Sequence, residues 1–371
     1  RIVSQDDHSM VATIIVNFFC ADLTAGAVNS VLTDTPGAHV VVVDNSESPA
    51  EAELLKTVLD GRAQLLVNKR NTGFGAACNL GFAATDTDLV MLLNPDARAM
   101  PGCIPILAAA LHAHPELGAV SPTQWWEPSG RWLLPPAWLP TGIGMWSVEQ
   151  AWRLPRWAIR LSHAYRRLAL QAWTAQGEVV RQRALSGGAM MVRRSSALAA
   201  GGLFDPAYFM YYEDSDLCLR LRRAGMALAL VPRATALHEW SHSAAKIGMM
   251  EASKEIYLKQ HFEGKGAWAE RLSRCTAQPA RRQPLQYEAL SHLPEAIAVP
   301  SEWYAGWLLE VSPSPLLVPA IGQLGQGPSV ALPAPLMARL GAGPLYLRLG
   351  PAFADAPDAR LYVSENSAAG G

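Results

Sequence analysis

The first hundred residues alternate between short apolar runs and segments long enough to form a helix. The apolar runs are Val11–Phe18, His39–Val43, Leu65–Val67 and Asp88–Leu93. Runs of this length without strict polar alternation are typical of strands buried on both faces, and helix-sized spacers between them indicate β-α-β units. The pattern therefore predicts a parallel sheet that begins near Val11, after a disordered polar tail at residues 1–10.

Further along the chain this pattern is interrupted over residues 122–183. It resumes with predicted strands at Ala184–Arg193 and Ala227–Val231 and a predicted closing helix at Ile247–Phe262. We therefore expect one main domain over residues 11–275, with residues 122–183 as an insertion.

The last hundred residues have a different texture. Thirteen of the 27 prolines lie between Pro279 and Pro357, and short runs such as Pro344–Leu349 alternate like half-buried strands. The sequence predicts a small, proline-rich and β-rich accessory domain at residues 276–371, to which no chemistry can be assigned.

Polar residues directly follow three of the predicted strands. They are Asp44-Asn45, Arg70-Asn71 and Asn94-Pro95-Asp96. Ligands of open α/β sheets bind beyond the carboxyl ends of the strands, so these groups should converge on one crevice. Asp96 could then bind a divalent cation that bridges a diphosphate, although Asn, Pro and Asp are also ordinary turn residues.

The glycine-rich segment from Asn71 to Gly81 resembles a dinucleotide fingerprint only in part. Gly73 and Gly75 fit the opening of that motif, but Cys78 occupies the position of its third glycine, and the segment follows the third strand rather than the first. A Rossmann oxidoreductase is therefore disfavoured, and a loop whose backbone approaches a nucleotide is the better interpretation.

Three acids, Glu213, Asp214 and Asp216, follow the aromatic stretch Phe204–Tyr212 and begin a predicted helix that ends near Gly225. Capping a helix needs one such residue. Three acids beside an aromatic wall favour a partly desolvated carboxylate with a raised pKa, suited to general-base catalysis.

Eight of the twelve tryptophans lie between Pro122 and Trp173, interleaved with arginines. Tryptophan stacks on sugar rings and also favours membrane interfaces, where arginine attracts anionic lipid. Two interpretations stay open, a surface that contacts acceptor or membrane and an insertion that packs on its own aromatic core.

Composition sets a few broad limits. The formal net charge is −1, which argues against nucleic acid as a partner. The five cysteines are odd in number and lack a Cys-x-x-Cys pair, as expected of free thiols in a cytoplasmic protein. No apolar run reaches the roughly 18 residues of a membrane-spanning helix.

Together, these motifs resemble those of the inverting glycosyltransferases of family 2, in particular bacterial rhamnosyltransferase-like members. The matching segments are Val16-Asn17-Phe18, Val43-Asp44-Asn45 and residues 71–79, 94–96, 186–189 and 204–220, with His238. The resemblance covers about residues 11–262 and implies the GT-A fold of nucleotide-diphospho-sugar transferases, an α/β fold with a Rossmann-like mixed sheet. The β-rich accessory domain lies outside it.

The resemblance also implies a function. A sugar would pass with inversion from a dTDP- or UDP-sugar, such as dTDP-rhamnose, to a glycan or polyprenyl-linked acceptor in cell-surface polysaccharide synthesis. The enzyme would use Mg²⁺ or Mn²⁺ and work in the cytoplasm, at the inner face of the membrane.

The resemblance, together with the aromatic segments for the acceptor, assigns residues to four roles. The general base would be Asp214, with Glu213 as the other candidate, and the metal contacts Asp96 and His238. The nucleotide-sugar contacts would be Val16, Asn17, Asp44, Asn45, Arg70, Asn71, Gly73, Gly75, Asn79, Asn94, Gly187 and Gly188. The acceptor contacts would be Trp125, Trp126, Tyr211, Tyr212 and Trp240. The family's Asp-x-Asp metal motif is here Asn94-Pro95-Asp96, which leaves one carboxylate.

Two alternatives remain. A nucleotidyltransferase could share the nucleotide-binding half, but no Gly-x-Gly-x-Arg loop follows the first strand. A non-catalytic glycan-binding protein would explain the tryptophans, and it would not hydrolyse nucleotide sugars.

Overall fold

The computed structural model describes residues 11–241, 244–263, 271, 285–352 and 359–366. The predicted tail at residues 1–10 and the predicted boundary between residues 275 and 276 lie outside these residues.

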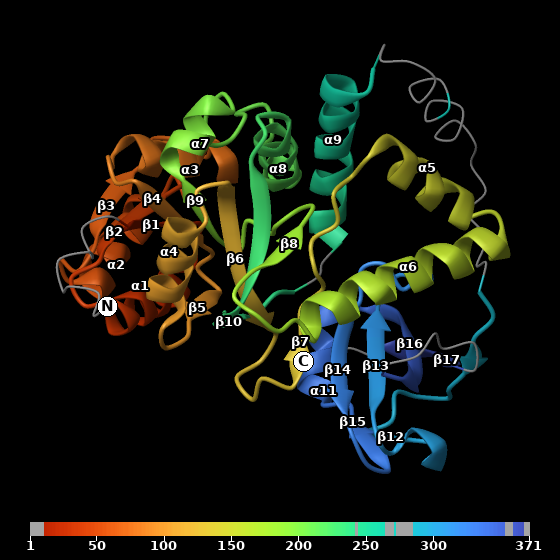
Figure 1. The fold of residues 1–371 in the computed structure, drawn as a ribbon. Helices are drawn as coiled ribbons and strands as arrows, with labels where there is room; N and C mark the ends of the chain where they lie inside the picture. The colour runs from red at the N-terminus through yellow and green to blue at the C-terminus, as the bar shows by residue number, and fades with distance from the viewer. Residues whose placement is uncertain (1–10, 242–243, 264–270, 272–284, 353–358, 367–371) are drawn as a thin grey trace.

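The N-terminal half is built from parallel strands, as the apolar runs predict. Strands pair in the order β3-β2-β1-β4, all parallel (Figure 1). Their bounds are β1 (Val11–Asn17), β2 (His39–Asp44), β3 (Gln64–Val67) and β4 (Leu89–Leu93). Every residue of β1 is buried, which explains why that strand has no polar face.

Helices cover both faces of this sheet. Side chains of α1 (Ala21–Asp34), α2 (Pro49–Leu59) and α4 (Cys103–Ala113) pack in one apolar core with Ile15 and Val42. The opposite core holds side chains of α3 (Phe74–Ala83), α7 (Arg194–Ala199) and α8 (Glu213–Arg223), packed on alternate strand residues such as Ile14 and Val41. The strands therefore have an apolar layer on each side.

Beyond β4 the sheet becomes mixed. Strand β9 (Ala189–Arg193) lies antiparallel between β4 and β6 (Leu117–Trp125), and β10 (Ala227–His238) runs parallel to β6. The short strands β5 (Ala97–Ala99) and β8 (Val180–Gln182) pair with β10. The strand predicted from Ala184 begins only at Ala189, because residues 184–188 form a loop that borders the candidate site.

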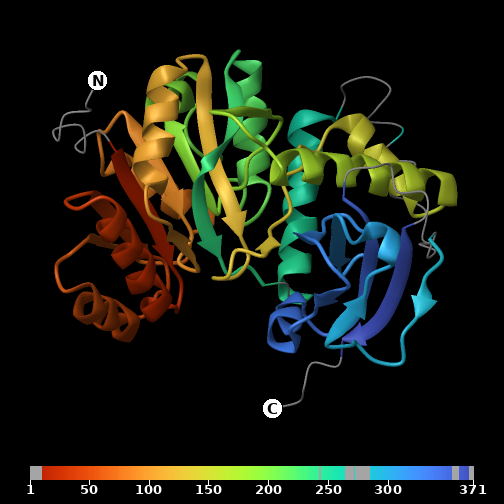
Figure 2. The ribbon, with the colours of Figure 1, turned by 60° about the horizontal axis from the view of Figure 1, so that its bottom comes forward.

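The C-terminal region is rich in strands, and its main sheet continues that of the N-terminal half. The elements are β11 (Glu288–Ala289), β12 (Ala296–Ala298), η2 (Ser301–Trp303), β13 (Trp307–Ser312), β14 (Ile321–Gly325), β15 (Ser329–Ala331), α11 (Ala334–Met337), η3 (Ala338–Leu340), β16 (Gly343–Pro351) and β17 (Arg360–Asn366). Strand β7 (Trp132–Leu133) joins the two parts, because it pairs with both β6 and β14. Figure 2 shows the two halves side by side, with α9 (Ala244–His261) between them.

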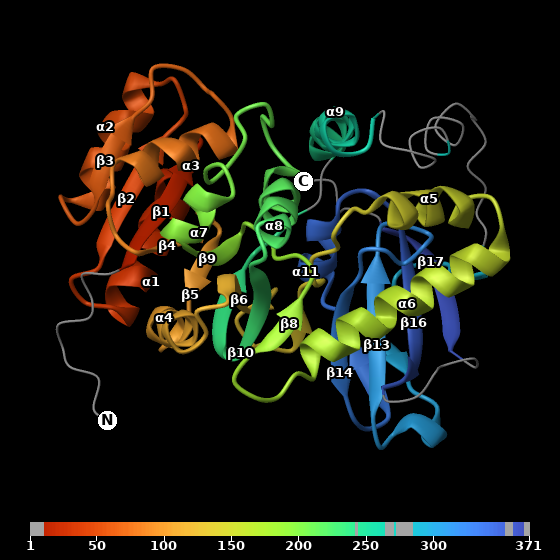
Figure 3. The ribbon, with the colours of Figure 1, turned by 45° about the horizontal axis from the view of Figure 1, so that its top comes forward.

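The Trp- and Arg-rich insertion forms the helices α5 (Gly142–Ala151) and α6 (Pro155–Trp173). Helix α6 lies across the C-terminal sheet (Figure 3). There Glu310, fully buried on β13, pairs with Arg166 of α6 at 2.6 Å and with Arg348 of β16 at 2.6 Å. The two arginines hold the pKa of Glu310 below its usual value although burial opposes this. The insertion therefore joins the two halves.

Candidate functional site

A buried polar network lies at the carboxyl ends of β1 and β2. Asn17 Nδ2 donates to Asp44 Oδ1 at 3.1 Å, to Ser46 Oγ at 3.2 Å and to Glu51 Oε1 at 3.1 Å. Asp44 is 1 % exposed, and its second oxygen, Oδ2, is buried without a hydrogen-bond partner. Because an unpaired buried acceptor is costly, Asp44 Oδ2 is a candidate acceptor for a ligand donor such as the N–H of a base.

The loop after β3 is held against this network. Asn45 Nδ2 donates to Asn71 Oδ1 at 2.7 Å, and Gly73 N donates to the same oxygen at 3.0 Å. Gly73 has φ of +84°, and a Cβ there would lie 2.2 Å from Phe209 O. These residues shape the loop through contacts within the protein, whereas Arg70 is exposed at its start.

Three residues predicted to contact ligands have other surroundings. Val16 packs in the apolar core beneath α3, so only its backbone could approach a nucleotide. Asn79 Nδ2 donates to Phe204 O at 2.8 Å, and Asn79 Oδ1 accepts from Phe204 N at 3.0 Å, so this side chain holds α3 to the segment before α8. Trp126 is fully buried and donates its ring N–H to Trp240 O at 2.7 Å. Its assignment as an acceptor-stacking residue is wrong, because neither ring face is accessible.

The predicted metal contacts do lie together. His238 Nε2 is 3.3 Å from Asp96 Oδ1 and 3.5 Å from Asn94 Nδ2, while Nδ1 donates to Gln124 Oε1 at 2.9 Å. Burial opposes ionisation of Asp96, but the hydrogen bond and charge of His238, aided by Lys246, hold its pKa below the usual value.

One carboxylate and one imidazole nitrogen whose ring is oriented by Gln124 fit a divalent cation that takes its other ligands from phosphate and water. Within the described residues no group of three or more His, Cys, Asp and Glu side chains is placed to hold a metal. The pair therefore fits a cation bound together with a diphosphate better than one bound by protein alone.

The acids at the start of α8 follow two strained residues. Tyr211 and Tyr212 have φ of +71° and +66°, a region that costs energy for bulky residues and is concentrated at functional sites. The N-cap residue Tyr212 makes no side-chain cap bond, and Asp214 accepts from the N–H of Ser215 in the first turn.

Asp214 and Glu213 differ in their surroundings. Asp214 Oδ2 accepts from Gly187 N at 3.1 Å and Oδ1 from Ser215 N at 2.7 Å, but burial outweighs these bonds and raises its pKa. Glu213 is 6 % exposed, and its Oε2 is buried without a partner. Burial, then the charge of Asp214, raises the pKa of Glu213 to about 8. The third acid, Asp216, is used structurally, since it pairs with Arg220 and His261.

Two adjacent glycines join the acid to the metal pair. Gly187 donates its N–H to Asp214, and Gly188 accepts from Asn94 N at 2.9 Å. A Cβ at Gly188 would lie 2.3 Å from His238 Cε1, so glycine permits this approach. Gly75 likewise packs against Phe204 and Glu213. The candidate base and the candidate metal pair therefore border the same short loop.

The remaining predicted acceptor residues border the site from two sides. Tyr212 lines a cavity of about 180 Å³ between α5 and α9, together with Trp138 and Leu258. The Tyr211 hydroxyl has a pKa raised to about 12 by burial and by the charges of Glu213 and Asp96, so it lies near both. Trp125 and Trp240 are half-buried where β6 and β10 end.

Sequence reasoning missed Gln124 and Lys246. Gln124 lies 114 positions from His238, and it falls in the insertion by pattern alone. Lys246, on α9, donates to Ser241 O at 2.6 Å and is close enough to Asp96 for their charges to interact. No local motif marks either residue.

Comparison with known proteins identifies the family. The family model for glycosyl transferase family 2 matches residues 13–148. An N-acetylglucosaminyl-diphospho-decaprenol L-rhamnosyltransferase of Mycobacterium tuberculosis is 34 % identical over 226 residues, which are 54 % of this chain and 68 % of that protein. The rhamnosyltransferase WbbL of Escherichia coli K12 is 49 % identical over 57 residues, 15 % of this chain and 21 % of that protein.

Among solved structures, GalNAc-T7 with UDP, GalNAc and Mn²⁺ aligns with a TM-score of 0.45 and 15 % identity over 72 % of this chain and 54 % of that one. The family model and the sequence relatives confirm the resemblance found in the motifs, and the mixed α/β sheet agrees with a GT-A fold. This chain belongs to glycosyltransferase family 2 and is a glycosyltransferase of the rhamnosyltransferase-like kind.

Proposed function

We propose that this enzyme transfers a sugar with inversion from a nucleotide diphosphate sugar to a hydroxyl of a glycan or lipid-linked acceptor. The observation that carries the proposal is the loop at Gly187 and Gly188. One glycine holds Asp214, and the next packs on His238 of the metal pair. Inverting transfer needs a base near the diphosphate site, because the base acts on the acceptor at one face of the sugar while the diphosphate leaves from the other, and this loop brings the two candidate groups close together.

On the donor side, Asp44 would bind the base through its unpartnered Oδ2. Asp96 and His238 would hold Mg²⁺ or Mn²⁺ with the diphosphate, and the cation would neutralise charge on the leaving group. Lys246 adds a positive charge near Asp96. The exposed Arg70 would lie at the rim of the nucleotide site.

On the acceptor side, Asp214 is the better candidate for the base. Its two backbone hydrogen bonds orient the carboxylate, whereas Glu213 is more deeply buried and has a pKa of about 8, which keeps it neutral near pH 7. Tyr212, two residues before Asp214, lines the cavity between α5 and α9, through which an acceptor could reach Asp214.

The donor would be a dTDP- or UDP-sugar, with dTDP-rhamnose first, and the acceptor would be polyprenyl-linked. The mycobacterial relative supports rhamnose and such an acceptor, because it is named an N-acetylglucosaminyl-diphospho-decaprenol L-rhamnosyltransferase. Within the described residues, no helix is long and apolar enough to cross a membrane. We propose contact with the membrane surface at its inner face instead, in cell-surface polysaccharide synthesis.

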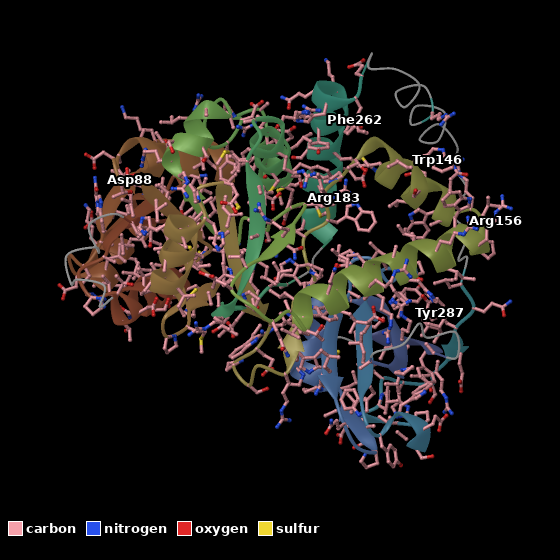
Figure 4. All side chains as sticks on the ribbon, viewed as in Figure 1. Asp88, Trp146, Arg156, Arg183, Phe262 and Tyr287 are labelled. Carbon is pink, nitrogen blue, oxygen red and sulfur yellow. The ribbon has the colours of Figure 1, made fainter. Side chains whose placement is uncertain are left out.

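The outer part of α5 and α6 supports this contact. Ile143 and Ile159 are 58 % and 48 % exposed, Arg156 and Arg160 are exposed, and Glu149 is the only acid among residues 128–177. Figure 4 places Trp146 and Arg156 at the far end of the two helices, away from the N-terminal strands. Exposed apolar and basic residues together favour anionic lipid.

The test is a screen of dTDP- and UDP-sugars by thermal shift with Mn²⁺, followed by measurement of slow donor hydrolysis and transfer. We expect Asp214→Asn to lower turnover by roughly 10²–10⁴-fold and to leave nucleotide-sugar affinity nearly unchanged, because the base acts on the acceptor. A wild type that binds nucleotide sugars without hydrolysing or transferring them would be a glycan-binding protein instead.

A further inference from the structure

A second cavity, of about 270 Å³, lies where β7 joins the C-terminal sheet, outside the residues assigned to transfer. Its lining comes from two parts of the chain far apart in sequence. The first is the turn between β6 and β7, and the second is the region from β14 to η3. The lining residues are Glu127, Ser129, Arg131, Trp132, Gln323, Ala331, Pro333, Pro335, Leu336 and Arg339.

Gln323 is an unusual residue for its position. It lies on β14 two residues after Ile321, so it faces the same side as that core residue. It is 9 % exposed, and its Oε1 is buried without a hydrogen-bond partner. An apolar residue would be more stable there, because an unpaired buried amide oxygen destabilises the fold. A polar group retained at such a position points to a ligand.

The other polar groups of the cavity are held in place. The Glu127 carboxylate accepts from Ser129 Oγ at 2.7 Å and from the N–H groups of Arg131 and Trp132 at 2.9 and 3.2 Å. These bonds outweigh burial and lower its pKa, so it stays ionised. Arg339 donates to Trp126 O and to Glu239 Oε1, each at 3.2 Å.

This combination favours a saccharide over an anion. Arg339 pairs with Glu239, and the positive charge of Arg131 offsets the negative charge of Glu127, so these four residues have no net charge. Sugar hydroxyls both donate and accept, so they can bond to the side-chain amide of Gln323, which lines the cavity, and to Arg131, which is exposed. Apolar surface from Pro333, Pro335 and Leu336 suits the C–H face of a sugar ring. The volume lies just below the roughly 300–1,000 Å³ of typical ligand pockets, which suits one or two sugar units.

The cavity is also connected to the transfer site. Glu239, which pairs with Arg339, follows the metal-pair residue His238, and its N–H donates to Asp96 O at 2.9 Å. We propose that the cavity is a saccharide-binding subsite, separate from the donor site, that holds a sugar unit of the acceptor glycan. Its assignment to the acceptor rests on the proposed function, whereas saccharide binding does not.

The test is saturation-transfer NMR on the full chain with methyl α-L-rhamnoside, N,N′-diacetylchitobiose, maltose and lactose, without nucleotide. We expect at least one of them to bind the wild type and the control Gln171→Leu, which changes an exposed glutamine of α6. Gln323→Leu and Arg131→Gln should each weaken that binding roughly tenfold, the effect of one lost hydrogen bond. Gln323→Leu should also raise the melting temperature, because it removes the unpaired oxygen.

Two results would overturn the proposal. Either none of the four saccharides binds, as for a cavity filled only by water, or both variants bind as tightly as the wild type. UDP and dTDP binding is measured on the same samples. Nucleotide binding without saccharide binding rejects the subsite alone, whereas absence of nucleotide binding rejects the proposed function.

Discussion

Replacing Glu213 with glutamine tests the electrostatics of the site most directly. Glu213 is buried beside Asp214, and burial together with that charge raises its pKa to about 8 from a usual value of 4.5. The side chain is therefore neutral at pH 7. Glutamine copies the neutral form in size and cannot ionise, so Glu213→Gln should fold and should retain most of the transfer activity at pH 7.

The size and sign of the stability effect follow from proton linkage. Below about pH 4.5 both the folded and the unfolded chain carry the proton, and Glu213 contributes no pH dependence. Between about 4.5 and about 8 only the folded state keeps it, so stability falls as the pH rises. The pKa difference corresponds to a loss on the order of 5 kcal/mol across this window. Glu213→Gln should remove this loss.

The assay is urea unfolding at pH 5, 7 and 8.5 for the wild type, Glu213→Gln and the control Glu255→Gln, an exposed acid of α9. The free energy of unfolding of Glu213→Gln should exceed that of the wild type increasingly as the pH rises, and the control should follow the wild type. Parallel pH profiles for all three proteins would refute a strongly raised pKa. A 10²–10⁴-fold loss of turnover in Glu213→Gln would identify Glu213 as the general base instead.

Three further outcomes are expected. Asp96→Ala should abolish the Mn²⁺ dependence of UDP binding, measured by calorimetry. If EDTA does not change UDP binding by the wild type, Asp96 does not act through a metal ion. Glu310→Gln leaves Arg166 and Arg348 buried without a negative partner, so it should lower the free energy of unfolding in urea by about 3–5 kcal/mol. The exposed control Glu302→Gln should change that free energy very little. Equal losses in the two variants would argue against a stabilising ion pair at Glu310. The double change of Arg156 and Arg160 to Gln should weaken co-sedimentation with anionic vesicles at low salt while the melting temperature stays the same; a wild type that ignores such vesicles at every salt concentration excludes the membrane contact.

Much of the N-terminal half could be predicted because its signals are local. A run such as Val11–Phe18 has one stable arrangement, a strand with an apolar layer on each face, and the structure places β1 there. The rule that ligands bind at the carboxyl ends of parallel strands then brought Asp44 and Asp96 to one edge, without any knowledge of side-chain contacts. Their chemical roles remain proposals.

The tryptophan-rich insertion shows where local signals end. Both open interpretations treated it as a unit with its own surface or its own core. In the structure β7 pairs with β14 and α6 packs on the C-terminal sheet, so Trp126 and Trp132 are buried in a core shared with residues near the C-terminus. Composition cannot distinguish a tryptophan that faces solvent from one that packs on a distant strand.

The sequence by itself determined where the first four strands lie along the chain, which polar residues follow them, and the family. Only the tertiary structure decided that Gln124 orients His238 and that Gly187 and Gly188 lie between Asp214 and the metal pair. It also decided that Gln323 Oε1 lacks a hydrogen-bond partner. The physical reason is the range of the interactions. Hydrophobic periodicity and turn chemistry act over a few residues, whereas these contacts, or their absence, depend on how segments up to about a hundred positions apart pack together.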